Sequence, residues 1–174
     1  MIKQDISGNR ANIIYLGIGS NLGNRKLNIE KTKFFLNQNR INCIKISEYY
    51  ETPSWPDTSN PKFLNIVLKV KCLYNPFDLL EVCKLIEFKL GRRKSLKNSP
   101  RVCDIDIIDY NKKIILKNTK QNLVIPHPKM HKRNFVLLPM FEICKKWTHP
   151  VHKVSIKVLI NSLKKDELRG IKIV

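Results

Sequence analysis

Acidic side chains are scarce in this sequence: 14 aspartates and glutamates stand against 33 lysines and arginines, for a formal net charge of +19 at pH 7. Such an excess could attract nucleic acid, a membrane surface or a small polyanionic substrate. The basic residues are spread along the whole chain, and lysine and asparagine fill many loop positions. We therefore attribute most of the charge to a general compositional bias and only a local part of it to function.

Long apolar runs and paired cysteines are also missing. No stretch approaches the roughly 18 apolar residues of a membrane span. The first twelve residues, MIKQDISGNRAN, have no apolar segment and include an acid, which argues against a signal or transit peptide. The cysteines are odd in number, scattered and without a C-x-x-C pair, which argues against a disulfide framework or a cysteine zinc site. We expect buried structural thiols and a cytoplasmic protein without membrane contact; the cysteines are Cys43, Cys72, Cys83, Cys103 and Cys144.

The apolar pattern predicts one compact domain over residues 1–174. Strands are indicated at 12–20, 44–52, 62–71 and within 99–111, with helices following the first strand and at 75–91. Asn24 and Asn75 are available as N-caps, Pro76 suits a first helical turn, and Gly91 can end the second helix. Strand, helix, strand, strand, helix, strand is the order of the ferredoxin-like α+β arrangement. Further helices are expected near 134–143 and 155–163.

The glycines of GIGSNLG lie between the first strand and the first helix. Gly17, Gly19 and Gly23 could form a dinucleotide-binding loop, but two adjacent strands follow, which breaks the alternation of a Rossmann sheet. The chain also has no G-x-x-x-x-G-K-[ST] sequence. We therefore interpret the cluster as a tight strand-to-helix turn.

The most informative stretch is SPRVCDIDIIDYN, residues 99–111. Asp104 and Asp106 are two apart in a β-rich run, so both carboxylates should project from the same face of a strand. Like charges placed so close destabilise each other unless a positive group lies between them. Mg²⁺ carrying substrate phosphates is one such group, and the basic loop RRKSLKNS directly before the strand could bind those phosphates. The alternative is a salt-bridged aspartate pair beside a solvated basic loop.

Six segments resemble, in order and spacing, the 6-hydroxymethyl-7,8-dihydropterin pyrophosphokinase family of folate biosynthesis. They are YLGIGSNLGNR, YYETPSW, FLNIV, LGRR, SPRVCDIDI and IPHPKMHKRNFVL. The resemblance covers nearly the whole chain and implies a ferredoxin-like core extended into a three-layer αβα domain. It also implies transfer of pyrophosphate from ATP to the hydroxymethyl group of the pterin with release of AMP, with two Mg²⁺ ions. We expect a monomer, although the sequence does not determine the oligomeric state.

Site residues follow from the resemblance position by position. Asp104 and Asp106 match the ligands of the two Mg²⁺ ions, and with Arg92 and Arg101 they form the expected catalytic set. The expected ATP-binding residues are Arg92, Lys94, Arg101, Ile107, His127 and Arg133. The expected pterin-binding residues are Thr52, Pro53, Trp55, Phe63, Asn65 and Phe135. Glu87 matches a family acid near the nucleotide, but it could equally lie on the solvated face of its helix, so its role stays open.

One loop departs from the family pattern. Where a typical member has a second arginine, then tryptophan and glycine, this chain has Lys94, Asn98 and Ser99. A lysine lacks the planar fork of arginine, and the aromatic lid is missing, so we expect weaker pterin binding than in a typical member.

Two other interpretations remain open at the level of sequence. Ferredoxin-like sheets also bind RNA, but the aromatic strand motif of such modules is absent here, so nucleic acid is not the expected partner. The altered loop also leaves room for a degenerate, inactive relative.

Overall fold

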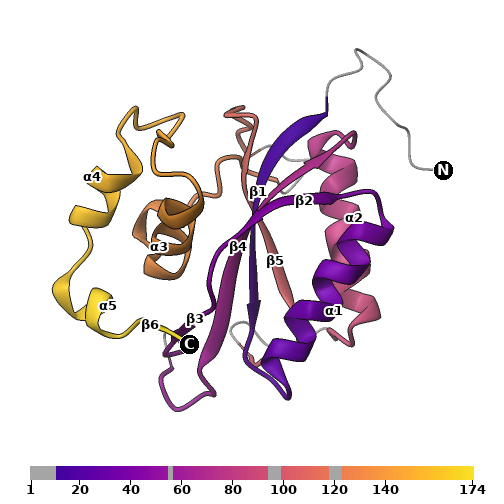
Figure 1. The fold of residues 1–174 in the computed structure, drawn as a ribbon, viewed down its shortest axis with the longest axis horizontal. Coiled ribbons are helices and arrows are strands. Elements are labelled where there is room, and N and C mark those ends of the chain that lie inside the picture. Colours follow the sequence, from indigo (N-terminus) through magenta and orange to yellow (C-terminus); the bar gives the residue numbers. More distant parts are fainter. Residues whose placement is uncertain (1–10, 55–56, 94–98, 118–122) are drawn as a thin grey trace.

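The computed structural model describes residues 11–54, 57–93, 99–117 and 123–174. A twisted antiparallel sheet lies between two layers of helices (Figure 1). Its strands are β1 (Asn12–Ser20), β2 (Asn42–Ile46), β3 (Tyr50–Thr52), β4 (Phe63–Cys72), β5 (Asp104–Tyr110) and β6 (Lys172–Ile173). The helices are α1 (Arg25–Gln38), α2 (Pro76–Lys89), α3 (Asn134–Ile143), α4 (Ile156–Asn161) and α5 (Lys165–Arg169), with a 3₁₀ turn at Met130–Lys132.

The strand order is β5-β1-β4-β3-β6. Strand β2 also pairs with β4, along residues 68–71, whereas β3 pairs with β4 along residues 63–65. Helices α1 and α2 cover one face of the sheet, while α3, α4 and α5 lie on the opposite side (Figure 1). This arrangement confirms the ferredoxin-like, three-layer αβα prediction. The short strand β6, which pairs with β3, the helix α5 and the 3₁₀ turn were not expected from the sequence.

The capping residues predicted from the sequence for α1 and α2 are confirmed. The Asn24 side chain accepts a hydrogen bond from the backbone N–H of Leu27, and the Asn75 side chain caps α2 in the same way. Pro76 opens α2, and Gly91 follows its end with a φ of 97°, a conformation that suits glycine.

The predicted strand over 44–52 is divided into β2 and β3. The break falls at Ser47, whose hydroxyl accepts a hydrogen bond from the backbone N–H of Val67. The Ser47 hydroxyl thus replaces a backbone carbonyl as the acceptor for the Val67 N–H, and the regular pairing with β4 is interrupted at this residue.

Two hydrophobic cores lie on the two faces of the sheet. The core beneath α1 and α2 takes one side of β4, as its alternation predicts: Leu64, Ile66, Leu68 and Val70. The core beneath α3 includes Val67 and Ile108 from the opposite face. Helix α3 packs over only part of this second face. Polar residues lie on the rest of it, where β1 ends and β4 and β5 begin.

The cysteines only partly follow the expectation of buried thiols. Cys72, Cys83 and Cys103 are buried as predicted, Cys144 is only half-buried, and Cys43 is exposed on β2, so the prediction is wrong for Cys43. Cys43 lies on β2, whose five residues are all exposed. Across the described segments, no helix combines the length and apolar character needed to cross a membrane.

Candidate active site

The two aspartates of β5 project from the sheet face that α1 and α2 do not cover, as the strand period predicts. Their strand neighbours Ile105 and Ile107 are buried in the core beneath those helices. Asp104 lies opposite Gly19 of β1, and Asp106 lies opposite Gly17. Because glycine has no side chain, β1 itself adds no side chain beside either carboxylate.

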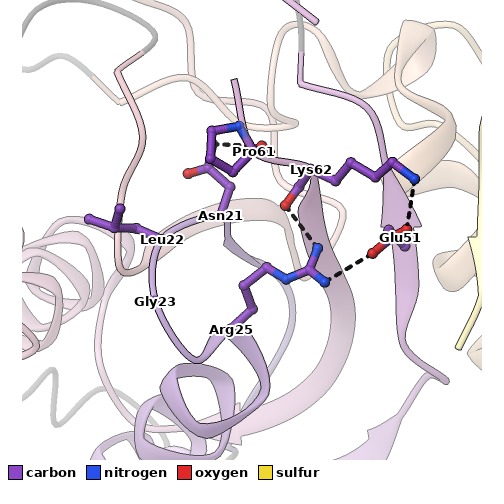
Figure 2. Close-up of a pocket in the computed structure, with 7 residues that line it drawn as sticks. All are labelled: Asn21, Leu22, Gly23, Arg25, Glu51, Pro61 and Lys62. Carbon is purple, nitrogen blue, oxygen red and sulfur yellow. Dashed lines mark hydrogen bonds and ion pairs between the residues drawn. The ribbon is translucent and has the colours of Figure 1, made fainter. Parts of the chain in front are cut away.

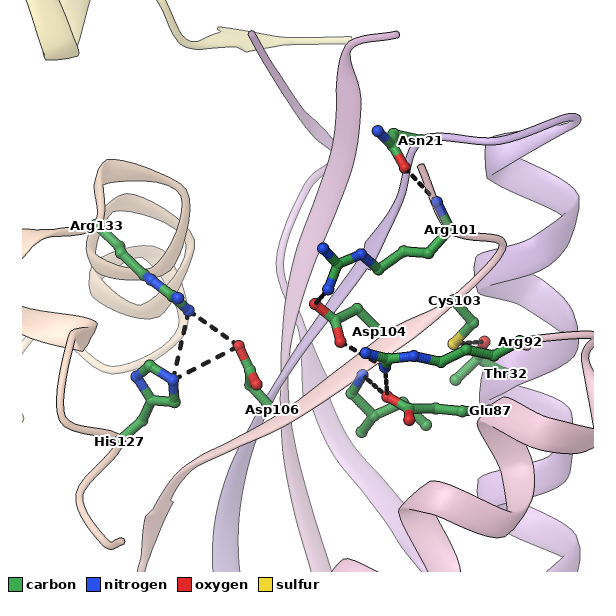
Figure 3. Close-up of polar contacts among 11 residues, drawn as sticks. Asn21, Thr32, Glu87, Arg92, Arg101, Cys103, Asp104, Asp106, His127 and Arg133 are labelled. Atoms are coloured by element: carbon green, nitrogen blue, oxygen red, sulfur yellow. Dashed lines mark hydrogen bonds and ion pairs between the residues drawn. The ribbon is translucent and has the colours of Figure 1, made fainter. Parts of the chain in front are cut away.

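Asp104 is held between two guanidinium groups. Nη1 of Arg92 lies 2.6 Å from one carboxylate oxygen, and Nη1 of Arg101 lies 3.0 Å from the other. Arg92 is the first residue of the basic loop and Arg101 lies shortly after its end, so both sides of the loop contribute a cation to one carboxylate. Figure 3 shows the pair approaching Asp104 from the side of α2.

Asp106 has two partners of its own, an arginine and a histidine, on the α3 side (Figure 3). Nη1 of Arg133 lies 3.0 Å from a carboxylate oxygen, and Nε2 of His127 lies 3.8 Å from the same oxygen. Desolvation and the neighbouring charge of Asp104 raise the pKa of Asp106 despite these partners. Desolvation also lowers the pKa of His127, which favours its neutral form.

Glu87 of α2 is buried beneath this cluster rather than solvated. Its Oε1 accepts hydrogen bonds from the backbone N–H of Ile105, at 2.7 Å, and from Nη1 of Arg92, at 2.5 Å. Burial raises its pKa to about 7. Glu87 therefore links α2 to the middle of β5 and fixes the position of an arginine that also binds Asp104.

A second group of polar and aromatic side chains lies across β1 on the same sheet face. Asn65 of β4 is opposite Gly19, which in turn is opposite Asp104, so the three form a row across adjacent strands. The Asn65 amide donates a hydrogen bond of 3.0 Å to the Thr52 hydroxyl, and both residues are buried. The Phe63 ring lies beside this pair, with the Arg101 guanidinium 5.9 Å from its centroid.

Gly19 is required by the close approach of this row. A Cβ at position 19 would lie 2.9 Å from Oδ1 of Asn65 and 3.5 Å from the Phe63 ring. Gly23, by contrast, has a φ of 64° and open space around it, as expected for the turn interpretation of the glycine cluster.

A cavity of about 390 Å³ opens at the same end of the sheet, between the β1–α1 turn and the start of β4. Figure 2 shows Arg25, Glu51 and Lys62 at this cavity, joined by ion pairs of 2.9 and 3.2 Å. The cavity extends the open face past Asn21, whose side chain also lines it.

The comparisons with known proteins agree with this geometry. A model of the 7,8-dihydro-6-hydroxymethylpterin-pyrophosphokinase family matches residues 15–145. A 2-amino-4-hydroxy-6-hydroxymethyldihydropteridine pyrophosphokinase of Bacillus subtilis (strain 168) is 38% identical over 135 residues, covering 77% of this chain and 79% of that protein. The protein of the same name from Aquifex aeolicus (strain VF5) is 38% identical over 148 residues, covering 83% and 88%. This chain belongs to that pyrophosphokinase family.

The pyrophosphokinase fold is also found among solved structures. The crystal structure of wild-type Plasmodium falciparum HPPK-DHPS has a TM-score of 0.69 to this chain at 19% sequence identity. The similarity covers 89% of this chain but only 45% of that one, so the chain spans less than half of the longer protein. At this level of identity the comparison concerns the fold.

Most of the residues expected to serve the pyrophosphokinase reaction lie together on one sheet face. Phe135 lies at the start of α3, partly buried, with the Arg133 guanidinium 5.4 Å from its ring centroid. Pro53 is exposed directly after β3. Ile107 is the exception, because its side chain is buried in the core on the other face and only its backbone could line an ATP site. Trp55, Lys94 and Asn98 lie outside the described residues.

Asn21 is a site residue that sequence reasoning missed. Its Oδ1 accepts a hydrogen bond of 2.7 Å from the backbone N–H of Arg101, and its Nδ2 donates one of 3.1 Å to the carbonyl of Pro61. Its own backbone N–H donates to the Arg101 carbonyl. The residue is buried and joins three loops around the site. The only sequence signal was its place in GIGSNLG, which was interpreted through the glycines alone.

Proposed function

We propose that this pyrophosphokinase transfers the pyrophosphoryl group of ATP to the hydroxymethyl oxygen of 6-hydroxymethyl-7,8-dihydropterin, and that it requires Mg²⁺. The hydroxymethyl oxygen attacks the β-phosphorus in line with the bond to the α-phosphate, and AMP departs. In this reaction most of the catalysis is positioning and neutralisation of charge on the phosphates, without a covalent intermediate. One domain over residues 1–174, acting as a cytoplasmic monomer, is sufficient for this chemistry.

The observation that carries the proposal is the row Asp104, Gly19, Asn65 across three adjacent strands. Strands lie roughly 5 Å apart, so a carboxylate with arginines and a buried amide with an aromatic ring stand on the order of 10 Å from each other. The middle residue, Gly19, adds no side chain of its own, and the Asn65 amide and the Phe63 ring lie over it. A polyanion site thus adjoins a site for a flat heterocycle, as transfer between a nucleotide and a pterin requires.

The carboxylates fit Mg²⁺ by their chemistry. Mg²⁺ prefers oxygen ligands and is commonly held by one or two carboxylates together with substrate phosphates. Burial and the charge of Asp104 raise the pKa of Asp106, and a divalent cation between the two carboxylates would relieve that repulsion. Two bound ions would neutralise charge on the phosphates and orient the attacking and leaving oxygens. The arginine salt bridges are compatible with this role, because the same guanidinium groups can turn to phosphate oxygens when ATP binds.

The protein's own side chains divide the remaining tasks. Arg92 and Arg101 reach the site from the two ends of the basic loop and bind phosphate oxygens of the transferred group. His127 and Arg133 bind the triphosphate from the α3 side, with Lys94 and the backbone of Ile107 completing the ATP site. Asn65 hydrogen-bonds the edge of the pterin, Phe63 and Phe135 stack on its ring, and Thr52, Pro53 and Trp55 line the pocket.

The experiment that tests the proposal measures AMP from Mg-ATP, with and without 6-hydroxymethyl-7,8-dihydropterin. Wild-type protein should form AMP only when the pterin and Mg²⁺ are both present. Asp104→Asn and Asp106→Asn should each lower kcat by at least about a hundredfold, since each removes a carboxylate from the charge-neutralising centre. Glu81→Gln removes an exposed carboxylate of α2 whose one ion pair within the described residues is with Lys84; it is the matched control and should retain activity. An active Asp104→Asn, Asp106→Asn double variant would show that these carboxylates do not hold an essential metal ion.

A further inference from the structure

Three of the four histidines in the chain lie close together. His131 belongs to the 3₁₀ turn before α3, whereas His149 and His152 belong to the loop between α3 and α4. His131 is half-buried, His149 is buried and His152 is exposed, so the cluster reaches from the interior to the surface. No role in the pyrophosphokinase reaction accounts for it.

The three imidazole rings contact one another. Their centroids are 4.9 Å apart for His131 and His152, 4.3 Å for His149 and His152, and 6.2 Å for His131 and His149. One nitrogen from each ring lies within 4.8 Å of the others. Zinc binds imidazole nitrogens at about 2.0–2.1 Å, which places ligands of a tetrahedral site roughly 3.4 Å apart. Rotation of the side chains of the exposed His152 and the half-buried His131 can shorten the distances between the ring nitrogens to this value.

The surroundings favour a metal ion over a network of protonated histidines. Among the described residues, none of the three histidines forms an ion pair with a carboxylate, and Lys132 adds further positive charge beside His131. Burial and the two neighbouring histidines lower the pKa of His149 to about 4. A neutral imidazole offers a lone pair, and imidazole is the ligand of zinc, copper, nickel and cobalt rather than of magnesium.

His149 is the fixed member of the cluster. Its Nδ1 accepts hydrogen bonds from the backbone N–H groups of Val151, at 3.2 Å, and His152, at 3.1 Å. The metal-free imidazole therefore carries its hydrogen on Nε2. Ligation through Nε2 moves that hydrogen to Nδ1, so the backbone N–H groups of Val151 and His152 lose their acceptor when the metal binds.

We propose that His131, His149 and His152 bind one divalent transition-metal ion of the zinc class, with water completing the coordination. His131 lies between His127 and Arg133, the two partners of Asp106. An ion at the cluster would therefore tie the segment that carries these two residues to the loop between α3 and α4.

Titration of the complete chain with Co²⁺ tests the proposal, because tetrahedral Co²⁺ has a characteristic visible absorption that Zn²⁺ abolishes by displacement. Wild-type protein should bind one Co²⁺ with this spectrum, and His152→Ala and His131→Ala should each bind at least about tenfold more weakly. The amide signals of Val151 and His152 should shift on addition of Zn²⁺. His152 is exposed, so its replacement by alanine should leave the thermal unfolding temperature unchanged.

Two control variants separate this site from other places that could take a metal ion. Cys43→Ala removes the exposed thiol, and Asp104→Asn removes a carboxylate of the substrate-binding face; neither should change the Co²⁺ spectrum. The proposal is overturned if wild-type protein gives no tetrahedral spectrum, if His152→Ala binds Co²⁺ as wild type does, or if either control variant abolishes binding.

Discussion

Replacing Glu87 with glutamine tests how the buried acid beneath the active site is ionised. Burial raises the pKa of Glu87 to about 7 from its ordinary value of 4.5. The folded protein therefore holds a proton at pH values where the unfolded chain has already released it. Stability from this proton is complete below pH 4.5 and is lost as the pH rises through about 7. Glutamine keeps the shape of the side chain and cannot titrate.

The size of the effect follows from the two pKa values. Each pH unit between them is worth about 1.4 kcal/mol, so between pH 5 and pH 8 wild-type protein should lose about 2–3 kcal/mol of unfolding free energy through this group. Glu87→Gln should not lose it. The unfolding free energy of the variant, measured relative to wild type, should therefore rise by about 2–3 kcal/mol between pH 5 and pH 8. Its altered hydrogen bonds to Ile105 and Arg92 impose a cost that is the same at both pH values and does not affect this difference.

Urea unfolding followed by circular dichroism at pH 5 and pH 8 measures this difference. Glu81→Gln on the exposed face of the same helix provides the control and should follow wild type at both pH values. The reasoning fails if the free-energy difference between Glu87→Gln and wild type is the same at pH 5 and pH 8. That result would mean that Arg92 keeps Glu87 ionised throughout this range.

Two further substitutions probe the substrate-binding face. Gly19→Ala places a Cβ 2.9 Å from Oδ1 of Asn65. The KM for pterin should therefore rise by roughly tenfold, while the KM for ATP stays unchanged. Steady-state kinetics with each substrate varied in turn measure both constants, and a parallel change in the two would contradict the prediction. Asn21→Asp keeps the acceptor for the Arg101 N–H and loses the donor to Pro61, whereas Asn21→Ala loses both. The alanine variant should therefore lose roughly tenfold or more in kcat and the aspartate variant clearly less, and equal losses would show that the Arg101 contact is not the one that matters.

Features that depend on a few neighbouring residues were determined by the sequence itself. The caps at Asn24 and Asn75, the alternation of β4 and the shared direction of Asp104 and Asp106 all follow from backbone geometry within one turn or one strand. The motifs spread along the chain also identified the family before any contact between distant segments was known. These properties need no knowledge of which elements pack together.

Contacts between distant segments were decided only by the tertiary structure. The burial of Glu87 depends on β5 passing beneath α2, and the role of Asn21 depends on three loops meeting at one end of the sheet. The clustering of His131 with His149 and His152 depends in the same way on how two loops pack around α3. In each case the environment of the side chain is set by residues that are far away in the sequence. These residues are brought together by burial of the two hydrophobic cores, and no local sequence pattern indicates that they will meet.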